Sequence, residues 1–399
     1  MSALAAPTTR QGLIALLTEA CELEHGLACS YLFAAFSLKQ RPEEGGLDAE
    51  QARLAKFWAS QIFFIAGQEM LHLAQAWNLL SAIGGAPYAL RPNLPQKSRY
   101  YPLHAPIMLE PFGEKALERF IVYETPSQTA HPALAAKARL SADEVAHGHV
   151  SIGELYGAIA DGFRSIGGLF VGDGEVQADR RLVQFTDLVP VRDTASALQA
   201  IAMITDEGEG VRADRTDCHF GMFRAVLDAF RAETTRGGAA FQPVRPVMSN
   251  PVADTRAGYG AAAHPITAPL TRETAELFDA VYALMLRALV FAFGPAGGAG
   301  EAHRAAQVAL ELMTSVIRPL GDALTCLPSG TANLNAGPGF GLRRFVGAPA
   351  DPPTAVRVLG EDLREAAADA RRLAAALPAQ PQLAVAAARL ADIAARLSS

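Results

Sequence analysis

A glutamate and a histidine inside an apolar helical stripe constrain this chain more than any other feature of its sequence. Segment 61–76 has the pattern of a long helix, in which Glu69 and His72 project from one face about one turn apart. The neighbours at helical spacing on that face are all apolar: Trp58, Ile62, Ile65, Ala76, Leu79 and Ile83. Burying a carboxylate and an imidazole costs free energy unless the two groups are paired or bind a metal. A Glu-x-x-His pair that faces the interior of a helical bundle is half of a dinuclear carboxylate site.

A second apolar stripe, with one acidic member, precedes this segment. Residues from about 10 to 40 have the spacing of a helix, and the stripe consists of Ile14, Leu17, Cys21, Glu24, Ala28, Tyr31, Ala35 and Leu38. Neither stripe carries a lysine or an arginine that could neutralise its acidic groups. We therefore predict that Glu24, Glu69 and His72 are metal ligands.

The later part of the bundle offers the remaining candidate ligands. Its helices are expected at about 113–124, 154–166, 194–209 and 216–232. Glu154 either binds a metal or closes a capping box with Ser151 at the start of its helix. The fourth long helix offers Glu209, with Glu207 as its substitute, and the nearest imidazole that follows is His219.

Glu209 and His219 can reach one metal pair only if the chain bends between them. Ten residues span ~15 Å along a continuous helix, which is too far. Glycines on both sides of Glu209 favour a helix end there, and a loop over 212–216 would bring His219 back. The alternative for His219, beside Phe220 and Phe223, is a hydrogen-bonded histidine of the core.

Other motifs give weaker indications. Glu144 and His147 also have the Glu-x-x-His spacing, with His149 close by, but no clear apolar stripe surrounds them and we interpret them as a polar loop or short surface helix. The sequence contains no P-loop, no Gly-x-Gly-x-x-Gly after a strand and no Gly-x-Ser-x-Gly elbow. Haem ligation by one of the nine histidines is left open.

Composition favours a helical protein outside membranes. Half of the 399 residues are hydrophobic, and no run of about 18 uncharged apolar residues occurs. The net charge of -6 disfavours nucleic-acid binding. The four cysteines form no Cys-x-x-Cys pair, and the first ten residues lack the pattern of a secretion signal. We expect a cytoplasmic protein.

The order of predicted elements gives an all-α fold with long crossover loops. The expected divisions are a four-helix bundle with the metal site over 10–233, a connection over 234–268, a second helical section over 269–345 and a C-terminal helical pair over 350–399. The helices expected after the bundle are 271–293, 300–326 and two within 352–397. The proline-rich stretch 86–112 is expected to cross over the bundle, and 167–190 to be loop with a short strand.

Several short segments resemble one protein family. They are Glu22-Leu-Glu24-His25, Tyr31 to Ser37, Glu69-Met-Leu-His72, Ser151 to Tyr156, Glu207 to Gly210 and Cys218-His219-Phe220. Together they are similar to bacterial ferritin-like proteins, and more narrowly to the group named after the iminophenyl-pyruvate dimer synthases of bisindole pigment pathways. The resemblance covers about residues 10–230 and reaches 345 more faintly. It implies a ferritin-like four-helix core, with metal ligands at Glu24, Glu69, His72, Glu154, Glu209 and His219 and with Glu207 as a substitute.

The expected function follows from this ligand set. We predict a dinuclear non-haem oxidoreductase with two iron ions, or manganese, that activates O2 to oxidise or couple a small organic, amino-acid-derived substrate. The expected partners are that substrate and O2, with no nucleic acid and no membrane, and a homodimer is one candidate assembly. The chain is much shorter than the pigment-pathway synthases, so it corresponds either to their ferritin-like portion or to a separate relative. A second candidate enzyme class is an imine-coupling or oxidatively dimerising synthase that uses haem elsewhere, with the bundle as its scaffold. The alternative is a non-catalytic ferritin-like metal-binding or structural protein.

Overall fold

The computed structural model describes residues 4–96, 106–125, 151–171, 177–178, 187–208, 216–253, 262–294, 299–342 and 347–397. These residues are mostly helical, and the predicted all-α class is confirmed. The chain divides into two compact units. Unit 1 contains Met1–Ala86, Gln96–Glu175 and Asp187–Val244, and unit 2 contains Pro87–Pro95, Val176–Thr186 and Arg245–Ser399.

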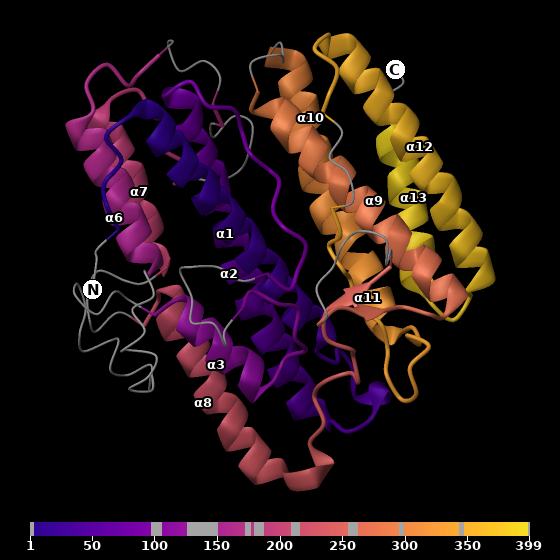
Figure 1. The fold of residues 1–399 in the computed structure, drawn as a ribbon. Helices are drawn as coiled ribbons and strands as arrows, with labels where there is room; N and C mark the ends of the chain where they lie inside the picture. The colour runs from indigo at the N-terminus through magenta and orange to yellow at the C-terminus, as the bar shows by residue number, and fades with distance from the viewer. Residues whose placement is uncertain are drawn as a thin grey trace. The chain divides into compact units, whose positions relative to one another are not determined.

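Two long helices, α1 (Arg10–Ser37) and α2 (Ala49–Ala82), form the framework of unit 1 and lie side by side (Figure 1). Thr9 caps α1 by accepting a hydrogen bond from the Gly12 N–H at 3.1 Å. Asp48 and Gln51 form a capping box at the start of α2. After Ala82 the chain turns at Gly84, where φ is +84°, a conformation that suits glycine. Both helices end within three residues of the predicted bounds.

The second layer of unit 1 is built from two pairs of shorter helices. One pair is α6 (Ile152–Ser165) with α7 (Thr194–Gly208), which pack on α1 and α2 respectively. The other is α3 (Glu114–Tyr123) with α8 (His219–Gly237). Figure 1 shows α6 and α7 along the upper part of α1 and α2, and α3 and α8 along the lower part. The described part of α7 reaches Gly208 and α8 begins at His219, and residues 216–218 before α8 are not helical, so Glu207 and His219 belong to two separate helices.

Shorter segments complete unit 1. A 3-10 turn at Pro42–Glu44 (η1) separates α1 from α2, and Gly238–Ala240 (η2) follows α8. Residues 106–112 of the predicted crossover run along α1, where Ser30 Oγ donates to the Met108 carbonyl at 2.5 Å and the Phe112 N–H donates to Ser37 Oγ at 2.7 Å. The described residues of 167–190 contain no strand.

Unit 2 is a separate helical assembly. Its elements are β1 (Pro251–Val252), β2 (His264–Pro265), α9 (Pro269–Ala292), α10 (Ala299–Leu312), the π-helical turn η3 (Met313–Ile317), α11 (Arg318–Cys326), α12 (Pro352–Ala376) and α13 (Pro381–Arg396). The strands pair in parallel, and α12 and α13 form an antiparallel pair that packs on α9 and α11. The continuous helix predicted over 300–326 is interrupted by η3. Pro319 explains the wider turn, because its ring lacks an N–H and crowds the carbonyl four residues earlier.

Candidate metal centre

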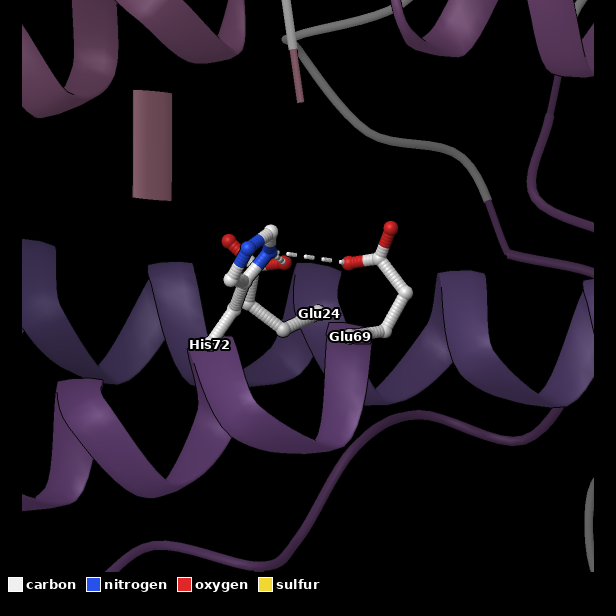
Figure 2. Close-up of side chains that lie close together, drawn as sticks. All are labelled: Glu24, Glu69 and His72. Atoms are coloured by element: carbon white, nitrogen blue, oxygen red, sulfur yellow. Dashed lines mark ion pairs between the residues drawn. The ribbon is translucent and has the colours of Figure 1, made fainter. Parts of the chain in front are cut away.

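The candidate metal centre lies in unit 1, where the α6/α7 pair meets the α3/α8 pair against the middle of α1 and α2. Glu24 comes from α1, and Glu69 and His72 come from α2. Figure 2 shows the three side chains pointing toward one another from the two helices. Their exposed fractions are 2%, 1% and 2%. The predicted meeting of these three residues is found in the structure.

The first group of ligand atoms is built around His72. Its Nδ1 lies 3.6 Å from Glu24 Oε2 and 3.5 Å from Glu69 Oε2. One ligand atom from each of the three residues falls within 4.8 Å of the other two. Nitrogen and carboxylate oxygen at such distances are suited to holding a divalent first-row metal.

A second group shares Glu69 with the first. It contains Glu69, Glu124 and His219, whose ligand atoms also lie within 4.8 Å of one another. His219 Nδ1 lies 2.9 Å from Glu69 Oε1 and 3.6 Å from Glu124 Oε2. Glu124 follows the last residue of α3, and His219 is the first residue of α8. The two oxygens of Glu69 therefore face different histidines, as in a carboxylate that bridges two ions.

Two buried atoms of this second group indicate that an ion fits between them. Glu69 Oε1 and His219 Nδ1 are 2.9 Å apart, yet neither atom makes a hydrogen bond. Buried polar atoms that make no hydrogen bond are rare and require an explanation, even when they form an ion pair as these two do. Metal–ligand bonds of about 2.1 Å at right angles place neighbouring ligand atoms about 3.0 Å apart. The observed separation is thus the one expected for two ligands of a shared ion, so the residues present fit a metal.

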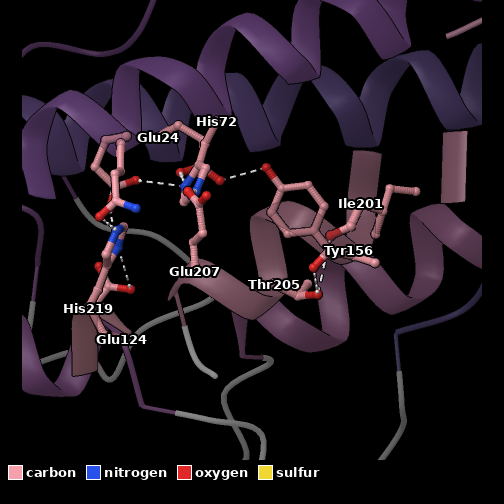
Figure 3. Close-up of polar contacts among 11 residues, drawn as sticks. Glu24, His72, Glu124, Tyr156, Ile201, Thr205, Glu207 and His219 are labelled. Atoms are coloured by element: carbon pink, nitrogen blue, oxygen red, sulfur yellow. Dashed lines mark hydrogen bonds and ion pairs between the residues drawn. The ribbon is translucent and has the colours of Figure 1, made fainter. Parts of the chain in front are cut away.

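A further set of side chains orients the candidate ligands (Figure 3). The second nitrogen of His72 contacts Glu207 Oε2 at 3.1 Å, and that of His219 contacts Gln68 Oε1 at 3.2 Å. Each terminal carboxylate accepts a hydrogen bond from a buried tyrosine: the Tyr156 hydroxyl donates to Glu24 Oε1 at 2.6 Å, and the Tyr31 hydroxyl donates to Glu124 Oε1. Such outer contacts fix the tautomer of a ligating histidine and the direction of its lone pair.

Burial and mutual charge shift the titration of the cluster. Burial raises the pKa of Glu24 to about 7, partly offset by His72. Burial alone would lower the pKa values of both histidines, but the surrounding carboxylates outweigh it. The pKa of His219 rises to about 9, and that of His72 lies well above its usual value. The opposite happens at Glu69, where His219 overcomes the effect of burial and holds the pKa below the usual value. Without metal, therefore, the raised pKa values favour protonated histidines, whose positive charge partly neutralises the carboxylates of the cluster.

A small cavity adjoins the cluster. It has a volume of about 20 Å³ and is lined in part by Glu24, Glu69, His72, Glu124 and Tyr156. That volume is enough for about one water molecule. The ligand atoms thus border a space of the size of one water molecule.

The other predicted site residues have different positions. Glu154 belongs to neither cluster: its carboxylate accepts a hydrogen bond from the Ser151 N–H at 2.8 Å, and the Ser151 hydroxyl accepts one from the Glu154 N–H. Of the two alternatives predicted for Glu154, the structure contains the capping box with Ser151. Glu207 contacts His72 from outside the ligand groups. Glu209, Glu144, His147 and His149 lie outside the described residues.

Glu124 is the member of the cluster that the sequence interpretation missed. It follows Leu117, Phe120 and Ile121 at helical spacing, and these three side chains are buried. A carboxylate that continues an apolar stripe was the criterion that identified Glu24, so the same signal was present here. Its position immediately after α3 concealed it, because a glutamate at a helix end is usually solvated.

Comparisons with known proteins agree with this fold. A family described as Ferritin-like matches residues 17–228. The chain is 30% identical over 353 residues to 2-imino-3-(indol-3-yl)propanoate dimerase of Chromobacterium violaceum, which corresponds to 82% of this chain and 33% of that protein. It is 29% identical over 371 residues to dichlorochromopyrrolate synthase of Lentzea aerocolonigenes, covering 84% of this chain and 36% of that protein. The chain thus spans about a third of the length of these curated relatives.

A solved structure supports the fold independently. The crystal structure of a ferritin-like protein from Caulobacter vibrioides matches with a TM-score of 0.50 and 21% identity, over 84% of this chain and 99% of that one. Within the described residues, no helix has both the length and the apolar character needed to cross a membrane. The family match covers more than half of the chain and includes both histidines and all three carboxylates of the cluster. The chain therefore belongs to the ferritin-like family.

Proposed function

We propose that the protein binds two metal ions in this cluster and uses O2 to oxidise or couple a small, amino-acid-derived substrate. The observation that carries the proposal is the sharing of Glu69 by two buried ligand groups. Glu69 would bridge the two ions. Glu24 and His72 would complete one ion, and Glu124 and His219 would complete the other.

The charges of the cluster support two divalent ions. Three ionised carboxylates and two neutral imidazoles carry a charge of about -3, against about +4 for two divalent ions. Buried carboxylates at this density require compensation, and no lysine or arginine is among the described ion-pair partners of these five residues. The mixture of carboxylate and imidazole ligands suits iron or manganese. When bound, a pair of iron ions supplies two redox-active centres that can pass electrons to O2.

The chain's own side chains would prepare the site for that chemistry. Glu207 and Gln68 hold the outer nitrogens of the histidines, so each Nδ1 can present its lone pair to an ion. Tyr156 and Tyr31 hold one oxygen of each terminal carboxylate. The buried surroundings exclude bulk water and strengthen the electrostatic interactions within the site.

The substrate class rests on the two curated relatives. One is named as a dimerase of an indole-bearing imino acid, and the other as a synthase of a dichlorinated chromopyrrolate. We extend to this chain the class of small imino or amino acids that carry a carboxylate. Joining two substrate carbons by replacing two C–H bonds with one C–C bond releases two electrons and two protons. O2 accepts the two electrons and the two protons and becomes hydrogen peroxide.

Metal analysis tests the proposal directly. Purified protein is reconstituted anaerobically with Fe(II) or Mn(II), desalted and measured for metal content. About two equivalents per chain are expected for the unmodified protein, and Glu69→Ala and His72→Ala should reduce this number. Glu118→Gln is the matched control, because Glu118 lies on exposed α3 surface and pairs with Arg231.

Metal content below about half an equivalent in the reconstituted protein would refute a dinuclear site. The oxidase activity is tested separately, by consumption of O2 when the iron-loaded protein is mixed with imino acids generated from aromatic amino acids. Metal binding without substrate-dependent O2 consumption would favour the non-catalytic alternative.

A further inference from the structure

The two halves of the cluster differ in their surroundings. We name them the Glu24 half, which consists of Glu24 and His72, and the Glu124 half, which consists of Glu124 and His219. Each half has one carboxylate, one histidine and one tyrosine that donates to the carboxylate. The two sets of ligands are therefore alike, and any difference between the ions must come from the residues around them.

The tyrosine of the Glu24 half borders the small cavity. Tyr156 lines the cavity together with Glu24 and His72, and so do Ile204 and Thr205 of α7. Figure 3 shows the Tyr156 hydroxyl directed at Glu24, with Thr205 on the same side of the site. The cavity thus reaches the carboxylate, the histidine and the tyrosine of this half.

The tyrosine of the Glu124 half is enclosed by aromatic rings. The ring of Tyr31 lies 4.7 Å from that of Phe120 and 4.8 Å from that of Phe223, measured between centroids, and these two phenylalanines lie 5.2 Å apart. Glu124 touches the cavity, but neither His219 nor Tyr31 belongs to its lining in the part of the chain that the structure describes. All three rings are fully buried.

The outer partners of the histidines also differ. His72 is held by a carboxylate, Glu207, whose side chain is 19% exposed. His219 is held by the neutral amide of Gln68. A carboxylate partner makes an imidazole a stronger electron donor than an amide partner does. The two ions would therefore be inequivalent in charge density as well as in access.

We infer that the exchangeable coordination position of the dinuclear centre lies in the Glu24 half, and that Tyr156 keeps it open. The inference rests on the proposed function. By holding Glu24 Oε1, the Tyr156 hydroxyl leaves Oε2 as the one oxygen available to the ion. Without that hydrogen bond, Glu24 can bind through both oxygens and occupy the position that faces the cavity. Tyr156 is thus a positioning residue that acts through Glu24.

Cobalt and azide provide the test, because Co(II) needs no oxidant and its visible spectrum changes when a small anion enters its coordination shell. The apoprotein is loaded with Co(II), its metal content is measured, and azide is titrated. The same is done for Tyr156→Phe and Tyr31→Phe, a matched pair that removes one hydroxyl from each half. A third variant, Thr205→Leu, fills the cavity without changing a ligand or its hydrogen-bond partner.

We expect about one azide to bind per pair of cobalt ions. Tyr156→Phe and Thr205→Leu should each weaken azide binding at least about fivefold, a loss of roughly 1 kcal/mol, whereas Tyr31→Phe should change it less than about twofold. Equal effects of the two tyrosine variants, or no effect of Tyr156→Phe and Thr205→Leu, would overturn the inference. Failure of the unmodified protein to hold two cobalt ions would instead overturn the proposed function, so the two failures are distinguishable.

Discussion

The sharing of Glu69 makes a graded prediction about metal loading. Glu124→Gln removes one charged ligand from one group only, so the protein should still bind the ion of the Glu24 half. Glu69→Gln removes a ligand from both groups, so binding of both ions should fail. The neutral amide keeps the shape of the side chain, and its oxygen is a much weaker metal ligand than a carboxylate.

The magnitude follows from linkage between binding and folding. A metal present at 100 times its dissociation constant stabilises the folded protein by about 2.7 kcal/mol per site, and hence by about 5.4 kcal/mol for two independent sites. In a unit of about 200 residues, each kcal/mol raises the melting temperature by roughly 2–4 °C. Saturating metal should thus raise the melting temperature by about 10–20 °C in the unmodified protein, about half as much in Glu124→Gln, and by less than about 2 °C in Glu69→Gln.

Thermal unfolding with and without Mn(II) measures these shifts, and each variant is compared with its own metal-free form. This comparison removes any change that the substitution makes to the apoprotein. Glu118→Gln serves as the control and should retain the full shift, because its carboxylate contacts only Arg231 among the described ion pairs. A Glu69→Gln protein that keeps half or more of the metal-induced shift would refute the bridging role. A Glu124→Gln protein that loses the whole shift would refute the assignment of Glu124 to one ion.

Four further outcomes are expected. Metal binding should release protons, because apoprotein His219, with its pKa raised to about 9, and Glu24, with its pKa raised to about 7, are at least partly protonated near neutral pH. The raised pKa values stabilise the apoprotein fully below pH 6.5 for His219 and below pH 4.5 for Glu24, and this stabilisation is lost as pH rises through about 9 and about 7. Apoprotein stability should therefore fall, and metal affinity should rise, as pH increases over that range. Calorimetry in two buffers of different ionisation enthalpy measures the released protons, and their absence would contradict the assignment. Ser151→Ala should lower the free energy of unfolding by about 1 kcal/mol, measured by urea unfolding, because it removes the cap of α6. Glu154→Gln should leave metal content unchanged, because Glu154 bonds to the Ser151 backbone and not to the cluster. A drop in metal content would instead identify Glu154 as a ligand.

Local periodicity was sufficient for the first half of the site. In a helix, the spacing of apolar residues fixes which face is buried, and Glu24, Glu69 and His72 lie in the interior of long helices that have capping residues at their starts. Two residues on one stripe must point the same way whatever the rest of the chain does. The fold class, the bounds of α1 and α2, and the meeting of these three side chains could therefore be predicted from the sequence.

The second half of the site required the tertiary structure, for a physical reason. Glu124 and His219 stand at helix ends, where side-chain direction depends on how one helix meets the next and not on periodicity. The sequence left open whether Glu154 binds a metal or closes a capping box. In the structure Ser151 engages Glu154 locally, and it is Glu124, held by Tyr31, that joins the cluster. The sequence by itself determined that acidic groups and imidazoles enter the core; only the meeting of the α6/α7 and α3/α8 pairs determined which of them converge there.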